Sequence, residues 1–321
     1  MLSCIIPSRS AQYLKKTVDD LLNKAEGEVE VIIIYDGRWP EPHEMPVNDP
    51  RVFQLHHGEL FDNYGMRPSI NLGVQVARGD YIMIIDEQCG VGPGYDRILS
   101  ENCEDDWVVI PRRMRLEPES WTLIEDGRPP IDYMYVEYPY VLPLDKTQGL
   151  HGAEWKRPER AEIMIDDTPT MQGSCYFMKK SYWESTIGPL DDVNYGPFTQ
   201  EAQEVSMKCW LSGGRVVVNK LTWYSHWHKG KGGKGYGFSN AQYKRHCEGM
   251  EKGRLFCIDH WLNTKDYKYD WNWFVTEKFP DMPGWSADWR ERVEKDKAND
   301  YSTLGYKDDY WLAGLRDANT R

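Results

Sequence analysis

The sequence predicts an α/β protein built on a mostly parallel sheet with helices on both faces. Over the first 90 residues, short β-branched apolar runs alternate with longer segments of helical periodicity, as in parallel βαβ units. Several apolar runs end directly in polar residues, as expected where the strands of an open α/β sheet reach a ligand-binding edge. With 321 residues, the chain has room for one large domain and a C-terminal extension.

The individual elements follow in order from these patterns. Residues 2–7 predict a short apolar strand, and residues 11–25 carry apolar side chains at helical spacing. Residues 29–35 form a β-branched run that stops at Asp36 and Gly37, a turn pair. The remaining expected elements are a weak strand at 52–55, a helix at 66–77, strands at 81–85, 107–111, 173–178 and 215–218, and a helix at 199–211.

Three further stretches differ in composition from these elements. Residues 114–170 are rich in proline, glutamate, tyrosine and aspartate, and we expect an ordered loop region or an edge ribbon. Residues 229–239 are rich in glycine and should be mobile unless a ligand orders them, whereas residues 255–321 are aromatic, charged and expected to be helical. We therefore predict a main domain at 1–240 and a mainly helical extension at 241–321 packed on it.

Composition excludes several classes of protein. The net charge of −12 disfavours a non-specific nucleic-acid binder, which needs lysine and arginine to neutralise phosphates. No apolar run is long enough to span a membrane, no signal peptide is recognisable, and the seven scattered cysteines form no C-x-x-C pair. These features predict a reduced, cytoplasmic protein with no membrane partner. Because neither G-x-G-x-x-G nor a Walker sequence occurs, a classical dinucleotide-binding domain and a P-loop NTPase are not expected.

The triplet Asp86-Glu87-Gln88 comes directly after the apolar run at 81–85. A carboxylate at the end of a buried strand faces the ligand crevice of an α/β sheet. Oxygen ligands placed there suit Mg²⁺ or Mn²⁺ bridging a diphosphate. The alternative is that Asp86 only starts a turn before the glycines at 90, 92 and 94.

Four other polar residues are candidates for ligand binding. Asp36, at a strand end, can accept a hydrogen bond from a nucleobase imide or a ribose hydroxyl, or it only starts a turn. Arg67 precedes a helix and could grip nucleotide phosphates with its fork, or it is a surface arginine. Glu201 and Glu204 lie one turn apart near a helix N-terminus, either facing the cleft or favoured there by the helix dipole alone.

Taken in order, these motifs resemble those of glycosyltransferases with the GT-A fold. The segments CIIPSRS, VEVIIIYDG and ARGDYIMIIDEQ look like the first, second and metal-site strands of glycosyltransferase family 2. The segments MQGSCYFMKKSYW and QEAQEVSMKCWLSGG look more like the polypeptide N-acetylgalactosaminyltransferases. The resemblance covers roughly residues 2 to 235, and the style of the sequence also resembles glycosyltransferases encoded by bacterial viruses.

The resemblance implies a metal site made of Asp86, Gln88 and His226, with His228 as a substitute for His226. The family carries a second aspartate or a histidine where this chain has Gln88, which is a weaker and neutral ligand. His226 lies 22 residues beyond Glu204, the offset at which the N-acetylgalactosaminyltransferases place a metal-binding histidine. Imidazole beside carboxylate favours Mn²⁺ over Mg²⁺.

The resemblance also implies donor and acceptor contacts. The nucleotide-binding set is Pro7, Ser8, Arg9, Asp36, Arg67 and Lys229. Lys229 and the glycine-rich stretch 230–237 would form a phosphate-gripping lid, or are a solvated linker. The sugar- or acceptor-binding set is Glu201, Glu204, Trp223, Trp227 and His228, although core packing is the alternative for the aromatic residues.

The catalytic residues expected from the resemblance are Glu201 and Asp86. Inverting members of family 2 carry a base aspartate where this chain has Ala202. Glu201 then serves as the general base for the acceptor hydroxyl, or the reaction retains anomeric configuration and Glu201 only binds sugar or acceptor.

The expected function is metal-dependent transfer of a sugar from a nucleotide-diphosphate sugar, UDP-linked by resemblance, to an acceptor hydroxyl. A hydroxymethylated pyrimidine of viral DNA, a glycan and a protein are the candidate acceptors, and a viral enzyme would act in the host cytoplasm. The first alternative is a nucleotide-sugar- or carbohydrate-binding module without catalysis, which Gln88 and Ala202 favour. A nucleotidyltransferase is a weaker alternative, because residues 8–20 contain no glycine-rich, lysine-containing loop.

Overall fold

The computed structural model describes most of the chain. The described residues are 1–9, 12–38, 40–41, 48–58, 65–140, 148–196, 198–228 and 240–298. Lys229 and the glycine-rich stretch 230–237 lie outside the described residues, as does the part of the C-terminal extension beyond 298. Among the described helices, none is both long and apolar enough to cross a lipid bilayer.

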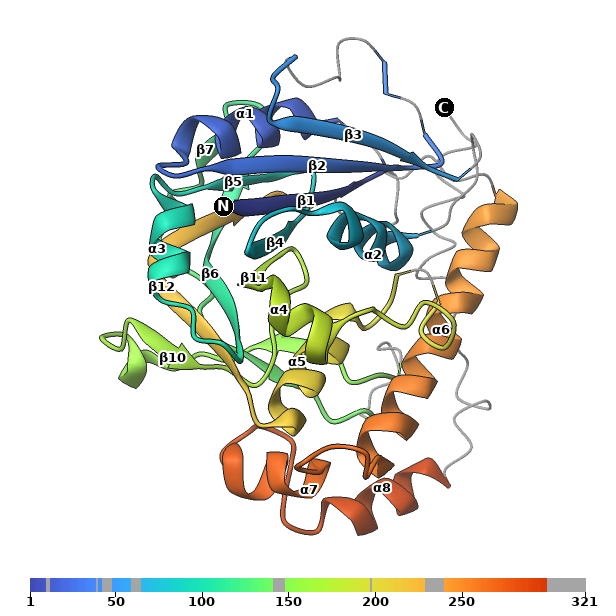
Figure 1. The fold of residues 1–321 in the computed structure, drawn as a ribbon. Helices are drawn as coiled ribbons and strands as arrows, with labels where there is room; N and C mark the ends of the chain where they lie inside the picture. Colours follow the sequence, from blue (N-terminus) through green and yellow to red (C-terminus); the bar gives the residue numbers. More distant parts are fainter. Residues whose placement is uncertain are drawn as a thin grey trace.

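In the described part of the chain, a ten-stranded sheet forms the centre (Figure 1), with the strand order β10-β12-β6-β11-β4-β1-β2-β3 and with β5 and β7 attached at its side. Four neighbouring strands run parallel, namely β1 (Leu2–Ser8), β2 (Val29–Asp36), β3 (Val52–His57) and β4 (Tyr81–Ile85). Next to β4, the antiparallel strand β11 (Cys175–Lys179) separates it from β6 (Trp107–Glu117), which in turn pairs in parallel with β12 (Arg215–His226). The predicted mostly parallel α/β sheet is therefore confirmed, and the antiparallel strand β11 makes it mixed.

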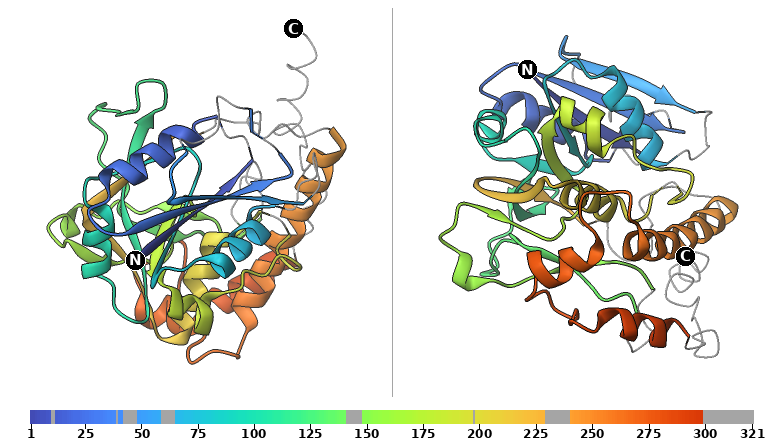
Figure 2. Two further views of the ribbon diagram at one scale, coloured as in Figure 1. Left: turned by 45° about the horizontal axis from the view of Figure 1, so that its top comes forward. Right: turned by 60° about the horizontal axis from the view of Figure 1, so that its bottom comes forward.

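Helices cover both faces of this sheet, as the alternation of patterns predicted (Figure 2). One face carries α1 (Leu14–Lys24) and α3 (Tyr95–Glu101), and the other carries α2 (Met66–Val76) and α5 (Glu201–Ser212). Because both faces are covered, every residue of β2 is buried, which explains its uninterrupted apolar run. Gly73 lets α2 approach the sheet, since a Cβ at this position would stand 2.4 Å from Ile5 Cγ2.

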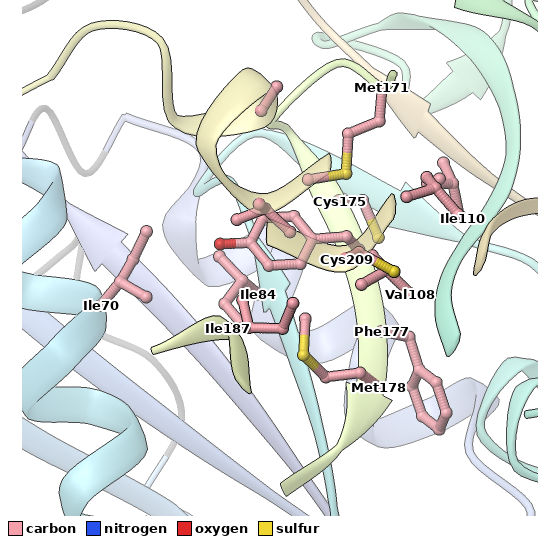
Figure 3. Packing of buried hydrophobic residues seen from close by; sticks show 14 of the residues in the cluster. Ile70, Ile84, Val108, Ile110, Met171, Cys175, Phe177, Met178, Ile187 and Cys209 are labelled. Atoms are coloured by element: carbon pink, nitrogen blue, oxygen red, sulfur yellow. The ribbon is translucent and has the colours of Figure 1, made fainter. Parts of the chain in front are cut away.

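The core continues from the parallel strands into the space between β11, β6 and α5 (Figure 3). The fully buried side chains of Ile84, Val108 and Phe177 come from three neighbouring strands, and Cys209 reaches them from α5. Burial of such side chains stabilises the fold by roughly 1.5–3 kcal/mol each relative to exposure. This packing fixes α5, and with it the start of the helix that carries Glu201.

The segment 114–170 is partly regular, which confirms an edge ribbon over a loop for part of it. Strand β6 continues to Glu117 and pairs with β7 (Thr122–Leu123). A separate two-stranded ribbon joins β8 (Met134–Val136) to β9 (Gly152–Glu154). The remaining short elements are β5 (Cys89–Val91), η1 (Pro158–Arg160), β10 (Ile165–Asp167), α4 (Lys180–Tyr182) and η2 (Trp183–Ile187).

The C-terminal part is helical as far as it is described. It comprises α6 (Asn240–Asn263), α7 (Trp271–Trp273), the π-helical turn η3 (Phe274–Lys278) and α8 (Trp289–Lys297). In Figure 1, α7 and α8 lie at the end of the molecule opposite β3. Trp261 donates from its indole to Tyr195 Oη at 2.6 Å, and Trp285 donates to the Val136 carbonyl at 2.8 Å. Since buried apolar side chains form one cluster through both parts, the division at residue 240 stays a prediction.

Candidate functional site

The carboxyl ends of three parallel strands meet at one edge of the sheet and carry the first candidate residues. Ser8 ends β1, Asp36 ends β2, and Asp86 directly follows β4. Because β1 pairs in parallel with both β2 and β4, these ends lie side by side. The structure therefore brings together the strand-end residues that the sequence singled out.

Glu87 organises the loop after β1, a role that sequence reasoning missed. Its Oε2 accepts hydrogen bonds from Ser8 Oγ at 2.5 Å and from the Arg9 backbone N–H at 3.2 Å. Its carbonyl accepts one from Thr17 Oγ1 at 2.9 Å. The side chain is only 3% exposed, so this carboxylate is part of the frame of the site. Pro7, inside β1, pairs with Ile34 and belongs to the same frame.

Asp36 is tied to the start of α2. Its Oδ2 accepts a hydrogen bond from the Gly65 backbone N–H at 3.0 Å, and its carbonyl accepts one from Arg9 Nη1 at 2.6 Å. Gly65 has φ 98°, in the left-handed region that favours glycine. Asp36 therefore joins three segments at the edge of the sheet, and its contact with a nucleobase or ribose stays a prediction.

Asp86, Gln88 and His226 come together although 138 residues separate the last two. His226 Nε2 lies 3.2 Å from Asp86 Oδ2 and 3.1 Å from the Gln88 side-chain nitrogen. The pairing of β12 with β5, which sets His226 opposite Cys89, creates this proximity. The Asp86 side chain is 27% exposed and His226 only 8%, so the cluster opens to solvent on the aspartate side.

These three side chains fit a divalent cation. Two ligands bound at right angles to one ion, each about 2.1 Å from it, lie about 3 Å apart, and Asp86 Oδ2 and His226 Nε2 are 3.2 Å apart. Gln88 Oε1 is buried and has no hydrogen-bond partner among the described residues. A buried polar atom without a partner is expected where a bound ion or ligand completes the site. No cluster of three histidine, cysteine or carboxylate side chains suited to a metal occurs in the described residues. The set of Asp86, Gln88 and His226 does not count as one, because Gln88 is an amide.

Arg113 adjoins this cluster, and sequence reasoning missed it as well. It is 6% exposed, its Nη2 lies 3.2 Å from His226 Nδ1, and the same nitrogen contacts His228 Nε2. The two imidazole rings meet edge to face with centroids 4.8 Å apart. Burial first, and then the Arg113 cation, lower the pKa of His228 to about 4, so this imidazole is neutral at physiological pH.

Glu201 opens α5 behind the strand ends. Gln200, the residue before it, has φ 58°, a left-handed conformation that costs a non-glycine residue on the order of 1 kcal/mol or more. Glu201 is 4% exposed, and its Oε1 accepts a hydrogen bond from Tyr176 Oη at 2.6 Å. Burial raises the pKa of Glu201 to about 8 against the opposing Tyr176 hydrogen bond and Arg67 charge, while Asp86 and Glu204 add to the rise.

Arg67 and Glu204 form a buried ion pair, with side chains 0% and 1% exposed. Arg67 also donates to the Thr199 carbonyl at 2.6 Å and stacks on Tyr195 at 4.4 Å, so it clamps the turn that precedes Glu201. The alternative of a surface arginine is wrong, because the side chain is fully enclosed. The predicted contacts of Arg67 with phosphates and of Glu204 with sugar have no support in this geometry, because Arg67 and Glu204 bind each other.

The two tryptophans predicted to stack on a sugar lie in different surroundings. Trp227 donates its backbone N–H to the Gln88 carbonyl at 3.2 Å and meets Tyr13 edge to face at 5.1 Å, close to the loop that carries Asp86 and Gln88. Trp223 lies under the Lys24 ammonium, 5.2 Å from the ring centre, at the C-terminal end of α1. Trp227 is the better placed of the two for a ligand, and both roles stay predictions.

The fold is shared with solved glycosyltransferase structures. GalNAc-T7 with UDP, GalNAc and Mn²⁺ matches with a TM-score of 0.61 and 14% sequence identity, over 89% of this chain and 58% of that one. S. aureus TarS 1-349 in complex with UDP-GlcNAc matches with a TM-score of 0.51 and 14% identity, over 98% of this chain and 80% of that one. The chain thus has a GT-A-like mixed α/β fold.

Comparison of the sequence with known proteins also points to glycosyltransferases. Residues 3–149 match the model of the family Glycosyl transferase family 2, which confirms the expected glycosyltransferase class. The uncharacterized glycosyltransferase EpsJ of Bacillus subtilis is 25% identical over 115 residues, 34% of this chain and 32% of that protein. Glycosyltransferase GlyG of Streptococcus pneumoniae is 28% identical over 107 residues, 32% of each chain. The matched region thus spans about a third of the length of these curated relatives.

Proposed function

We propose that this chain is a metal-dependent glycosyltransferase that moves a sugar from a UDP-linked donor to an acceptor hydroxyl. The observation that carries the proposal is the meeting of Asp86, Gln88 and His226 at the carboxyl edge of the parallel strands. The family 2 match over residues 3–149 supports it, as do structural neighbours that hold UDP, UDP-GlcNAc or Mn²⁺.

Asp86, Gln88 and His226 would hold Mn²⁺ or Mg²⁺. The ion, when bound, neutralises the charge that develops on the departing diphosphate, as a Lewis acid does. Ser8, Arg9 and Asp36 line the neighbouring strand ends, where a nucleotide binds in an open α/β sheet. Lys229, outside the described residues, belongs to the same proposed nucleotide-binding set.

Glu201 would contact the sugar or the acceptor through Oε2. Tyr176 holds Oε1 at 2.6 Å, whereas Oε2 has no hydrogen-bond partner among the described residues. With a pKa of about 8, Glu201 is mostly protonated at pH 7 and can donate a hydrogen bond there. A protonated carboxyl is not a general base, so we propose that Glu201 binds sugar or acceptor and that the reaction retains anomeric configuration.

Replacing Gly173 by alanine is expected to lower kcat/KM by roughly 10- to 100-fold, because small displacements of a positioned group cost that much. A Cβ at position 173 would stand 2.9 Å from Glu201 Oε2. The hydrogen bond from Tyr176 to Glu201 Oε1 opposes a rotation of the carboxyl group away from this Cβ. Steady-state kinetics with a UDP-sugar measure the effect. The control is Gly27→Ala, two residues before β2, where the added Cβ meets Asp96 Oδ2 at 3.1 Å. Equal kinetics for the two variants would refute the role of Glu201 Oε2.

Glu201 should make the free energy of unfolding decrease as pH rises from about 4.5 to about 8. The pKa is raised in the folded state from 4.5 to about 8, so in this window the folded protein keeps a proton that the unfolded chain has lost. Glu201→Gln mimics the protonated form and lacks this contribution. Urea unfolding of both proteins from pH 5 to pH 9 should show the variant gaining stability relative to wild type as pH rises. A constant difference between the two would contradict the raised pKa.

The acceptor remains to be chosen among hydroxyls of a glycan, a protein or a hydroxymethylated pyrimidine in DNA. The net charge of −12 weighs against DNA, although a viral origin would favour it. All seven cysteines are free, which fits a reducing cytoplasm, that of the host if the protein is viral. Incubation with labelled UDP-sugars and each acceptor class decides the question, and label in only one class identifies the acceptor.

The second candidate is a binding module that has lost catalysis. The contact of Arg113 with His226 favours it, because a cation beside the imidazole opposes a metal ion. Turnover of UDP-sugars in the presence of Mn²⁺ separates the two functions. Release of UDP supports the enzyme, whereas tight binding of UDP without turnover of any donor supports the module.

A further inference from the structure

Gln200, the residue before Glu201, combines two unfavourable features. Its backbone has φ 58° and ψ 26°, the left-handed conformation, which glycine adopts without steric cost and glutamine does not. The residue is only 8% exposed, and its side-chain Oε1 is buried without a hydrogen-bond partner among the described residues. The side chain does not cap α5 either. Because each feature costs free energy, stability of the fold does not account for a glutamine at this position.

Contacts on both sides hold Gln200 in this conformation. On one side, Arg67 donates to the Thr199 carbonyl at 2.6 Å. On the other side, the Gln200 carbonyl accepts a hydrogen bond from the Glu204 N–H at 3.0 Å and so starts α5. A strained residue persists only where the surrounding structure fixes it, and such residues concentrate at ligand-binding and active sites.

The turn that carries Gln200 adjoins the strand-end site. A Cβ on Gly173 would stand 2.9 Å from Glu201 Oε2, so residue 173 lies against the Glu201 carboxyl group. The carbonyl of the next residue, Ser174, accepts a hydrogen bond from the Asp86 N–H at 3.0 Å. Residues 173 and 174 therefore connect the start of α5 with the loop of the proposed metal site.

An unpaired amide oxygen selects for a ligand that can donate a hydrogen bond. A hydroxyl group carries one O–H donor and also accepts, so it can pair with the oxygen of an amide and with its nitrogen. A phosphate group offers strong acceptor oxygens and cannot supply the donor that Gln200 Oε1 lacks. The chemistry of this residue therefore suits a neutral, hydroxyl-rich ligand.

We propose that Gln200 binds a sugar hydroxyl beside Glu201 and helps to select the saccharide, an inference that rests on the function proposed above. The hydroxyl belongs to the sugar of the donor or to a saccharide acceptor. Binding gives Gln200 Oε1 the partner that the fold does not provide. Loss of the amide should therefore weaken sugar binding without weakening the fold.

The substitution Gln200→Met separates these two effects. Methionine nearly matches glutamine in shape but has no amide, so it keeps the buried contacts and removes the unpaired group. The midpoint of urea unfolding should stay at the wild-type value or rise. Sugar binding should weaken about fivefold, as expected for the loss of one hydrogen bond, whereas the affinity for UDP should not change.

Two sets of measurements identify the source of the hydroxyl. Isothermal titration calorimetry compares UDP with UDP-glucose, UDP-galactose, UDP-GlcNAc and UDP-GalNAc, and a loss of affinity confined to the UDP-sugars assigns the hydroxyl to the donor. Transfer to methyl glycosides of the common hexoses gives the KM of the acceptor. A raised acceptor KM with unchanged UDP-sugar affinity assigns the hydroxyl to the acceptor.

Gln203→Met is the matched control. Gln203 lies in the same turn of α5 and is 5% exposed, but its amide donates to Thr170 Oγ1 at 3.5 Å. Its replacement should leave UDP-sugar affinity and acceptor KM unchanged and should lower the urea midpoint, because Thr170 loses a partner.

Two results would overturn the proposal. One is a urea midpoint of Gln200→Met below that of wild type, which would show that the amide stabilises the fold. The other is UDP-sugar affinity and acceptor KM equal to those of wild type. Failure of the proposed function is distinguishable, because it appears in the wild-type protein itself as no release of UDP from any UDP-sugar.

Discussion

Replacing Asp86 by alanine should abolish UDP-sugar turnover, with a loss on the order of a thousandfold, while the protein stays folded. A metal ion supplies several kcal/mol of transition-state stabilisation, and each 1.36 kcal/mol corresponds to a factor of ten in rate. Asp86 is the only carboxylate of the proposed metal set. Since its side chain is 27% exposed, its removal leaves no large cavity. Release of UDP from several UDP-sugars, with and without Mn²⁺, measures the effect.

Asp80→Ala is the control for this substitution. Asp80 precedes the other end of β4, and its side chain is 85% exposed in an ion pair with the N-terminal amine. Its removal should change neither turnover nor Mn²⁺ dependence. Wild-type turnover in the Asp86→Ala variant, or equal losses in both variants, would reject the assignment of the site.

Replacing Arg67 by methionine should destabilise the protein by about 3–5 kcal/mol, the range for breaking one partner of a buried ion pair. Glu204 would keep its hydrogen bond from the Asp191 N–H at 3.0 Å and its contact with Lys208 at 2.7 Å, so the lower end of the range is expected. Arg67 also holds the Thr199 carbonyl, and activity should fall with the order of the turn before Glu201. Urea unfolding at pH 7 gives the change in the free energy of unfolding.

Two comparisons make this prediction specific. Arg97→Met removes an arginine whose side chain is 49% exposed and paired with Glu26 and Glu101, and it should change stability little. The double variant Arg67→Met with Glu204→Met replaces the pair by apolar side chains and should recover much of the loss. A loss for Arg67→Met no larger than for Arg97→Met would show that the buried pair does not hold the start of α5.

Much of the fold could be predicted because strands and helices each have a characteristic local spacing of apolar residues. The β-branched runs that end at Ser8, Asp36 and Ile85 became three adjacent parallel strands, and helical spacing marked α1 and α2 to within a few residues. Polar residues at strand ends could be found for the same reason, since the pattern changes abruptly where a strand leaves the core. The proximity of His226 to Asp86 was expected only through the family resemblance.

The rest of the site depends on contacts that no local pattern encodes. Arg113 lies in the part of β6 beyond its predicted end at residue 111, and only pairing with β12 brings it to His226. Tyr176 sits in an apolar strand where nothing marks its hydroxyl as a partner of Glu201. Arg67 could not be recognised as buried, because its burial comes from Glu204 and Tyr195, both more than a hundred residues away.

The most direct test of the account is a crystal structure of the protein with UDP and Mn²⁺, with the ion located by its anomalous signal. The account predicts one Mn²⁺ bound by Asp86, His226 Nε2 and the diphosphate, with Gln88 Oε1 facing the ion. UDP bound without Mn²⁺ at these side chains, or Mn²⁺ bound elsewhere, would contradict it.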